Sequence, residues 1–418
     1  MSAGEHMHGK PLECLLKKSM IILGIRMSRR KILMIPGPTE ISSEVLDAMR
    51  KPVIPHYGSE WVQIYRETIA MLKQVLQTTA DVFVIGGSAS SAMEASIAST
   101  IEPGDKVLVE LSGMFGLRFK EIVEAHRGKV ISLEVKPGDA VSPDEIRKKL
   151  ENERGIKALI AVHNETSTGV MNPVEELGKI SREYGLLYIV DAVSSLGAVE
   201  LKSDQWNVDL CIAGSNKCLE GSAGLAVVSV SDKAWKAIEG RKEGIRSWYL
   251  NLQNIRRYSV MWADWHPQGP VTMSTSLFVA LNVALKRVLK EGLQNRFERH
   301  RRIAKAVRGA MRAMSLEPFA RDESASHTLT AVRVPPGIKC EDLLKTMEDE
   351  HDIIISGGLG PTAGKIFRVG HMGTTASVEY VLPTIYSLQK SLKKLGFAAT
   401  RDSEAKSIQA ILEYDKLG

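Results

Sequence analysis

The sequence predicts an α/β fold built on a mostly parallel β-sheet. From about residue 80, short runs rich in apolar and β-branched residues alternate with longer amphipathic segments, which is the pattern of strand–helix–strand units. Several of the short runs are apolar along their whole length, as is typical of strands covered by helices on both faces. Ligands bind outside the carboxyl ends of the strands in such sheets. Polar residues that directly follow a strand are therefore the first candidates for a site.

The expected strands and helices alternate between residues 81 and 230. The expected strands are 81–87, 106–110, 130–135, 157–163, 186–191, 208–214 and 225–230. The expected helices between them are 90–100, 121–128, 143–155 and 174–185. Turn and stop signals, such as Pro103-Gly104-Asp105 and Gly185, separate these segments.

Composition limits the class of protein. A chain of 418 residues predicts two or three domains, and 44% hydrophobic and 25% charged residues are typical of a soluble globular protein. Residues 1–30 contribute +4 of the formal net charge of +6, and no basic block lies beside aromatic residues, so nucleic-acid binding is not favoured. No apolar run approaches about 20 residues, the length of a membrane span. We expect residues 1–30 to form a disordered or loosely docked extension.

The four cysteines, Cys14, Cys211, Cys218 and Cys340, are widely spaced. They match neither a disulfide framework nor a zinc-binding CxxC pair. We therefore expect no metal site and a reducing, cytoplasmic setting.

A turn of small residues follows the first expected strand. Residues 88–91 read Ser-Ala-Ser-Ser and begin the next helix, and Ser91 and Glu94 have the spacing of a capping box. Free backbone N–H groups and hydroxyls at a helix start suit a phosphate group. A capped helix start without a ligand is the alternative.

Two charged residues stand at the ends of other expected strands. Asp191 closes the run 186–191, where a carboxylate needs a cation or several donors; capping of the segment 192–196 is its alternative role. Lys217 follows the run 208–214, and an ordinary surface lysine is its alternative interpretation. A lysine amine, a carboxylate and a phosphate-binding turn at neighbouring strand ends are the three fixed points of a pyridoxal phosphate site.

From about Ile35 to Leu395 the sequence resembles the class V aminotransferases, which are fold type I pyridoxal phosphate enzymes, and within them the alanine–glyoxylate and serine–pyruvate branch. The segments that carry the resemblance stand in the family's order: IPGPTEIS (35–42), GGSASSAMEA (86–95), SGMFGLR (112–118), HNETSTGVMNP (163–173), VDAVSSLGAVE (190–200), GSNKCLEG (214–221), RSWYLNL (246–252) and GGLGPTAGKIFRVGHMG (357–373).

The resemblance implies roles for residues that would hold the cofactor. Lys217 matches the lysine that forms a Schiff base with it, and Asp191 matches the partner of the pyridine nitrogen. Ser88, Ala89 and Ser90 match the segment that binds the phosphate.

Four further residues match family positions around the cofactor ring and the substrate. Asn216 stands where the family has a residue that helps to bind the phosphate, and Phe115 matches the aromatic ring that stacks on the cofactor. Thr166 matches the residue whose hydroxyl reaches the phenolic oxygen. Arg368 matches the arginine that binds the substrate carboxylate. Without the resemblance, Phe115 would be taken for a core residue and Arg368 for the partner of a structural acid.

Two segments depart from the family pattern. Relatives carry a Tyr and a Thr that reach the phosphate of the neighbouring subunit, whereas the corresponding stretch here is 265–270, Trp-His-Pro-Gln-Gly-Pro. Gln268 can still donate a hydrogen bond to a phosphate. Residues 221–224, Gly-Ser-Ala-Gly, replace a turn that is richer in proline in relatives.

The resemblance also implies the domain organisation. We expect an extension over 1–30, an N-terminal segment near the active site over 31–44, a large cofactor-binding domain over 45–290, a smaller C-terminal α/β domain over 291–400, and an extension over 401–418. The large domain should hold a mainly parallel seven-stranded sheet. The family pattern implies a homodimer with shared active sites, without a nucleic-acid or membrane partner.

The implied reaction is a two-stage transamination from a small amino acid, alanine or serine, to a 2-oxo acid, glyoxylate or pyruvate. Aminotransferases acting on 2-aminoethylphosphonate or pyridoxamine, with pyruvate as acceptor, are alternatives within the same fold. A cysteine desulfurase fits less well, because that branch has a histidine in place of Phe115 and Cys340 lies outside the matched segments. A dinucleotide-binding or non-catalytic α/β protein leaves most of the motifs unexplained; the chain has Glu110 at a strand end but lacks a complete GxGxxG.

Overall fold

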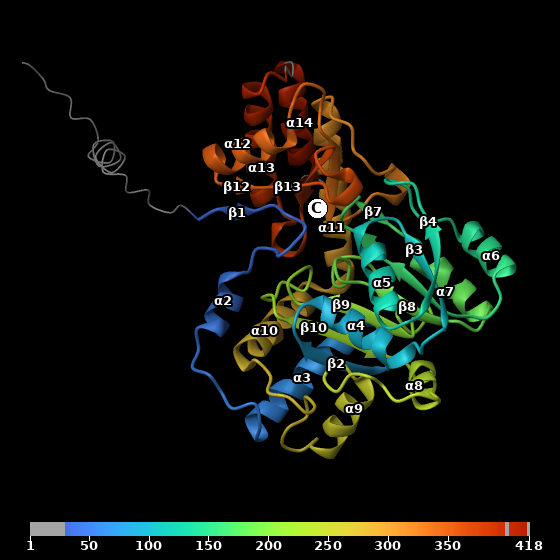
Figure 1. Ribbon diagram of the computed structural model, residues 1–418. Helices are drawn as coiled ribbons and strands as arrows, with labels where there is room; N and C mark the ends of the chain where they lie inside the picture. The colour runs from blue at the N-terminus through green and yellow to red at the C-terminus, as the bar shows by residue number, and fades with distance from the viewer. Residues whose placement is uncertain (1–29, 398–400, 416–418) are drawn as a thin grey trace, which may run out of the picture. The chain divides into compact units, whose positions relative to one another are not determined.

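The computed structural model describes residues 30–397 and 401–415, and its largest sheet has seven strands (Figure 1). The strand order is β2-β10-β9-β8-β5-β3-β4. The strands are β2 (Asp81–Gly86), β3 (Lys106–Leu111), β4 (Lys129–Glu134), β5 (Ile156–Val162), β8 (Leu187–Asp191), β9 (Leu210–Gly214) and β10 (Leu225–Val230). Strand β10 runs antiparallel to both neighbours, and the other neighbouring strands pair in parallel. The expected mainly parallel, seven-stranded α/β sheet is confirmed.

Alternate residues of the strands enter two separate hydrophobic cores, as the side-chain period of a strand requires. Val84 and Leu159 belong to the core on one face, and their neighbours Phe83 and Ile160 belong to the core on the other. The helices of the first core are α3 (Ser59–Leu76), α6 (Pro143–Asn152), α7 (Val174–Glu183) and α10 (Thr275–Glu291). The helices of the second core are α4 (Ala89–Thr100), α5 (Met114–Ala125), α8 (Asp232–Glu239) and α9 (Leu252–Met261). Because both faces are covered, the carboxyl ends of the strands and their loops are left for a ligand.

A third core is formed by the C-terminal part of the chain and includes Met311, Phe367, Ile385 and Ile411. It lies beside an antiparallel sheet of order β11-β14-β13. Its elements are α11 (Leu293–Ala313), β11 (Leu329–Arg333), α12 (Cys340–His351), β13 (Ser356–Gly357), β14 (Ile366–Gly370), α13 (Val378–Lys394) and α14 (Arg401–Asp415). Ile411 of α14 is fully buried in this core, so the described part of the expected C-terminal extension packs with the domain beside it.

Short elements complete the described chain. Strand β1 (Ile32–Leu33) pairs in parallel with β12 (Ile353–Ile354), and β6 (Asn164–Glu165) pairs with β7 (Val170–Met171). Helix α2 (Ser43–Met49) packs on α10. Three 3₁₀ turns cover Asp322–Ser324, Gly360–Thr362 and Gly373–Thr375.

The start of α4 differs from the capping box expected at Ser91 and Glu94, and that expectation is wrong. The helix begins at Ala89, with Ser88 as its extended N-cap residue. The Ser91 hydroxyl instead donates to the Ser88 carbonyl oxygen over 2.8 Å. Because Ser88 rather than Ser91 is the N-cap residue, the first N–H groups of α4 belong to the residues directly after Ser88.

The predicted extension over 1–30 falls, except for Arg30, outside the described residues, and the domain boundaries at 44, 290 and 400 stay predictions. Among the described residues, no helix combines the length and the apolar character needed to cross a membrane. A cytoplasmic location stays a prediction.

Candidate functional site

Lys217 lies in the turn that follows β9, at the carboxyl edge of the large sheet. Its Nζ atom donates a hydrogen bond to the carbonyl oxygen of Pro36, from the segment after β1. Gly37, at φ +103°, lies against the same side chain: a Cβ atom there would come within 2.6 Å of Nζ, Cε and Cδ of Lys217. The N-terminal segment thus closes over the amine, and only a residue without a side chain fits at position 37.

The Lys217 amine is poised between its charged and neutral forms near neutral pH. Burial is the largest influence and lowers its pKa to about 8; Cys218 and Asp191 oppose that shift, whereas Arg368 and Arg118 add to it. An ammonium group loses hydration on burial, and Nζ donates to a neutral carbonyl oxygen, that of Pro36. Such an amine is deprotonated more readily, and the neutral form is the nucleophile.

Asp191 closes β8 and is buried beside residues 215–220, which carry Lys217 and are called the lysine turn below. One carboxylate oxygen accepts a hydrogen bond of 2.8 Å from the Val193 N–H. Burial raises the pKa of Asp191 to about 7; Val193 opposes the shift, Glu165 adds to it, and Lys217 opposes it. A carboxyl group in this setting would be stabilised as a carboxylate by a cationic N–H partner, which is what a protonated pyridine nitrogen offers.

The start of α4 faces the two loops that carry Asp191 and Lys217. A Cβ atom on Gly214, the last residue of β9, would lie 3.3–3.4 Å from the Ala89 Cβ, the Asn216 Oδ1 and a Val193 methyl group. The Ser88 side chain is exposed and makes no capping hydrogen bond to its own helix. Exposed hydroxyl and first-turn N–H groups give this helix start the donors that a phosphate needs.

Phe115 is held in place by a buried carboxylate. The Phe115 N–H donates to Glu165 Oε2 over 2.9 Å, and the other oxygen of Glu165 accepts from the N–H and the hydroxyl of Ser167. The exposed guanidinium of Arg118 lies over the Phe115 ring, with its carbon 4.8 Å from the ring centre. This ring is half-buried, as a ring that covers a ligand would be.

Arg368 reaches from β14 to the loops of the large sheet. Its Nη1 donates to the Thr166 carbonyl oxygen over 2.9 Å and its Nε to the Gly357 carbonyl oxygen over 2.8 Å. Burial lowers the pKa of Arg368 to about 10, and Glu165 opposes that shift. The guanidinium is thus fixed by neutral oxygens and keeps its charge at neutral pH, as anion recognition requires.

The structure brings together nine of the ten residues predicted for the site. The nine lie in loops, at the starts of α4 and α5, at the end of β8 and within β14, and they are Ser88, Ala89, Ser90, Phe115, Thr166, Asp191, Asn216, Lys217 and Arg368. Their roles toward a cofactor or a substrate stay predictions.

Gln268 is the tenth predicted residue, and within its own chain it is engaged elsewhere. Its amide oxygen accepts from the Trp61 indole over 2.7 Å, and its amide nitrogen bonds the His56 carbonyl oxygen and the His266 ring. A phosphate contact of Gln268 across a dimer stays a prediction.

Three features of the site were not assigned from the sequence. Glu165 and Arg118 lie in segments that carry the family resemblance, 163–173 and 112–118, but only the structure shows that both contact Phe115. Arg296 donates to the Cys218 carbonyl oxygen in the lysine turn and lies in α11, a helix that was not among those expected from the sequence. Its two carboxylate partners, Glu220 and Glu291, come from separate parts of the chain.

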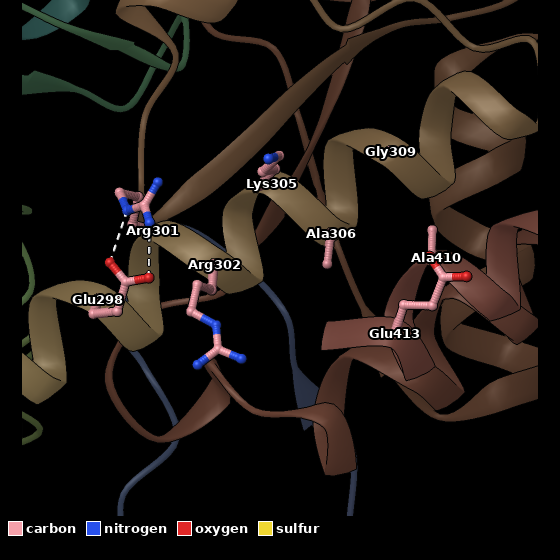
Figure 2. A pocket seen from close by; sticks show the side chains of 8 residues that line it. All are labelled: Glu298, Arg301, Arg302, Lys305, Ala306, Gly309, Ala410 and Glu413. Carbon is pink, nitrogen blue, oxygen red and sulfur yellow. Dashed lines mark hydrogen bonds and ion pairs between the residues drawn. The ribbon is translucent and has the colours of Figure 1, made fainter. Parts of the chain in front are cut away.

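A hollow of about 460 Å³ lies between α11 and α14, away from Lys217 (Figure 2). Its lining is Glu298, Arg301, Arg302, Lys305, Ala306, Gly309, Ala410 and Glu413. On α11 these residues are about half a helical turn around from Arg296. Helix α11 therefore has one face toward the lysine turn and another toward α14.

The residues around Lys217 fit pyridoxal phosphate. They supply a partly buried amine, a buried carboxyl group that would gain from a cationic partner, and a helix start with exposed donors. The half-buried Phe115 ring adds a flat apolar surface. Gly37 and Gly214 leave space where a Cβ atom would crowd the lysine or the helix start.

The chain belongs to the aminotransferase class V family, whose model matches residues 33–376. It has the fold type I architecture of pyridoxal phosphate aminotransferases, and the protein is a transaminase.

Relatives with related names cover nearly the whole chain. An uncharacterized aminotransferase of Methanocaldococcus jannaschii is 43% identical, over 88% of this chain and 94% of its own. An L-aspartate–glyoxylate aminotransferase of Paracoccus denitrificans is 34% identical, over 83% and 88%. An alanine–glyoxylate aminotransferase of Drosophila melanogaster is 34% identical, over 88% and 94%.

Solved structures show the same architecture. The ureidoglycine–glyoxylate aminotransferase of Bacillus subtilis superposes with a TM-score of 0.87 at 32% identity, over 94% of this chain and 99% of that one. The pyridoxamine–pyruvate aminotransferase of Mesorhizobium loti has a TM-score of 0.87 at 28% identity, over 94% and 99%.

Proposed function

We propose that this transaminase binds pyridoxal 5'-phosphate at Lys217 and transfers the amino group of alanine or serine to glyoxylate or pyruvate. The observation that carries the proposal is the partly buried Lys217 amine, which lies near Asp191 and whose pKa is lowered to about 8 by its loss of hydration. When bound, the cofactor supplies an aldehyde that condenses with amines and a ring that withdraws electrons from the substrate Cα.

The protein's own groups divide the remaining work. Lys217 would hold the cofactor and, once displaced by the amino acid, would move the proton at the substrate Cα. Asp191 holds a proton on the pyridine nitrogen. Ser88, Ser90 and Asn216 bind the phosphate, while Phe115 covers one face of the ring and Thr166 lies at its edge. These roles are the ones that the family resemblance implies, and the proximity of the side chains to the amine supports them.

Arg368 binds the carboxylate that amino and oxo acids share. A guanidinium fixed by two carbonyl oxygens can hold a carboxylate in one orientation. That orientation decides which bond at Cα is aligned for cleavage, so Arg368 favours removal of the proton over loss of the carboxylate. The same guanidinium would bind a phosphonate, and Arg368 therefore does not separate alanine from 2-aminoethylphosphonate as the donor.

A panel of donors and acceptors tests the proposal. The purified protein is mixed with pyridoxal phosphate, and the absorbance of the bound cofactor is followed as each amino donor is added. Alanine or serine should convert the bound cofactor, and glyoxylate or pyruvate should restore it. If aspartate, 2-aminoethylphosphonate or pyridoxamine reacts and neither alanine nor serine does, the proposed donor is wrong. If no cofactor binds, the proposed site is wrong.

We further propose that a second copy of the chain covers an apolar surface beside the site. Among the described residues, seven of the eleven large exposed hydrophobic side chains lie in two segments, 53–57 and 248–265: Val53, Tyr57, Trp248, Tyr249, Val260, Met261 and Trp265. The segments are linked by a 2.8 Å hydrogen bond from the Gly58 N–H to the Trp265 carbonyl oxygen. The Tyr249 hydroxyl reaches the Gly86 carbonyl oxygen, two residues before Ser88. A partner on this surface would lie next to the proposed phosphate site.

Light scattering after size-exclusion chromatography measures the oligomeric state. We expect a dimer, and Met261→Glu should shift it toward monomer, because a charge in an apolar interface is costly. The matched control is Leu412→Glu, an exposed leucine of α14 away from this surface. A monomeric parent protein would contradict the dimer and leave the assignment of Lys217 untouched.

A further inference from the structure

Arg296, at the start of α11, is a fully buried cation held by two carboxylates. Its guanidinium lies 2.7 Å from Glu220 and 2.7 Å from Glu291. Burial opposes the charged form, but the two carboxylates outweigh it and raise the pKa of Arg296. A buried ion pair adds little net stability compared with apolar packing. Stability alone therefore gives a weak reason for this arrangement.

The remaining N–H groups of Arg296 bind two loops that carry proposed site residues. Its Nε donates to the Gly197 carbonyl oxygen over 2.5 Å, and its Nη2 donates to the Cys218 carbonyl oxygen over 2.7 Å. Gly197 lies at the end of the turns that follow Asp191, and Cys218 directly follows Lys217. One rigid, planar group thus spans the two loops.

Two other contacts hold the lysine turn, one within the turn and one to the loop that follows Asp191. The Glu220 N–H donates to the Lys217 carbonyl oxygen over 3.0 Å, and Glu220 has a left-handed φ of +61°. The Cys218 thiol contacts the Ser194 carbonyl oxygen at 3.2 Å. Because Glu220 also accepts from Arg296, the same guanidinium fixes the turn at two points, a main-chain oxygen and a side-chain carboxylate.

The next turn of α11 holds the segment that follows the Arg368 strand. Arg299 donates to the Gly373 and Ala376 carbonyl oxygens over 3.0 and 2.7 Å. The His300 ring accepts from the Gly373 N–H over 2.9 Å. One face of α11 therefore binds both the lysine turn and the end of β14, but the contact to the lysine turn belongs to Arg296.

We propose that Arg296 is a positioning residue that fixes the main chain of Lys217 relative to Asp191. The proposal rests on the proposed function, in which Lys217 is the amine that attaches the cofactor. Arg296 acts through the carbonyl oxygens of Cys218 and Gly197 and touches neither cofactor nor substrate. A lysine at 296 could keep one carboxylate partner, but its single ammonium cannot span the two loops.

The test follows attachment of pyridoxal phosphate to Lys217 in the cofactor-free protein. The lysine nitrogen attacks the aldehyde carbon, a C=N bond forms and water leaves; added borohydride reduces that bond, and peptide mass spectrometry reports the modified residue. The rate is measured from pH 6.5 to 9.5. Arg296→Lys should slow modification of Lys217 about tenfold and move the midpoint of its pH profile.

Arg299→Lys is the matched control, because Arg299 shares the Glu291 partner but does not contact the lysine turn. It should keep the rate within about twofold and the midpoint unchanged, even if both variants lose similar stability on heating. Equal rates and midpoints in Arg296→Lys and the parent would overturn the proposal. If Arg296→Lys does not fold, Arg296→Gln takes its place, because a glutamine amide cannot reach the carbonyl oxygens of both Gly197 and Cys218, and a parental rate there would overturn the proposal equally. A parent protein that is never modified at Lys217 would instead refute the proposed function.

Discussion

Two cations, the fully buried Arg296 and the partly buried Lys217, meet at one short turn and have opposite surroundings. Arg296 contacts two carboxylates and its pKa is raised. Lys217 contacts a carbonyl oxygen and its pKa is lowered to about 8. Burial acts against the charged form of both, so the difference comes from the partners.

The comparison shows how one turn combines a fixed main chain with a reactive side chain. The carboxylates of Glu220 and Glu291 are used by the arginine, which binds the main chain. Asp191 is the buried acid that opposes the lowered pKa of Lys217, and its own pKa is raised to about 7. The lysine is thereby kept reactive while its backbone is held still.

Replacement of the lysine should have the largest effect. Lys217→Met should lower transamination at least about 10³-fold, because it removes the group that moves the proton. Steady-state rates with saturating pyridoxal phosphate give the number. A variant with more than a tenth of the parental rate would contradict the role of Lys217.

The same substitution should stabilise the cofactor-free protein at pH 7, by about 1–3 kcal/mol. The Lys217 pKa is about 8 in the folded chain and 10.5 in the reference state, so the unfolded chain binds the proton more tightly. Stability of the parent therefore rises between about pH 8 and 10.5, and the advantage of the variant should shrink across that window. Urea unfolding at several pH values measures the free energy of unfolding of the variant and the parent. A difference that does not change with pH would show that burial does not lower the pKa of the amine.

Replacement of Arg296 should instead destabilise the protein. Arg296→Met leaves two carboxylates without their partner and should cost about 3–5 kcal/mol in urea unfolding. Arg333→Met is the control, because its ion pair with Glu317 is exposed and should matter by about 1 kcal/mol or less. Similar losses in the two variants would mean that burial does not distinguish these ion pairs.

Gly37→Ala tests the contact on the other side of the lysine. The new Cβ atom would overlap Lys217, so modification by pyridoxal phosphate should slow about tenfold. Gly58→Ala is matched, because Gly58 also has a positive φ, +89°, but no atom lies within 4 Å of its Cβ position. Both should lose about 1–3 kcal/mol from backbone strain, and only Gly37→Ala should slow the lysine. Equal rates of Lys217 modification in the two variants would show that residues 36–37 can move aside without affecting the amine.

The smallest expected effect concerns Arg118. Its guanidinium lowers the pKa of Lys217, so Arg118→Gln should move the pH midpoint of lysine modification slightly upward. Arg118→Lys keeps the charge and should leave the midpoint in place. A downward shift in Arg118→Gln would show that the electrostatic effect has the wrong sign.

The sequence was sufficient to predict the sheet and the residues at its strand ends. Runs such as 186–191 are apolar throughout, so a charged residue at their end, Asp191, stands out. Arg296 could not be predicted in this way, because its partners are separated along the chain and meet only when α11 packs. Gln268 illustrates a second limit. Its type allows a phosphate contact, but packing gives its amide to Trp61 and His56 within the same chain.

The packing of helix α14 on α11 and α13 predicts how mutations that shorten the chain would act. Ile411 is buried in the core that α11 and α13 share, and the Gln389 amide donates to the Glu404 carbonyl oxygen over 2.9 Å. A premature stop codon near position 400 would preserve every residue proposed for chemistry. It would also remove α14 from one side of α11, whose other side holds the lysine turn, so a truncation far from Lys217 in the sequence should alter the position of its amine.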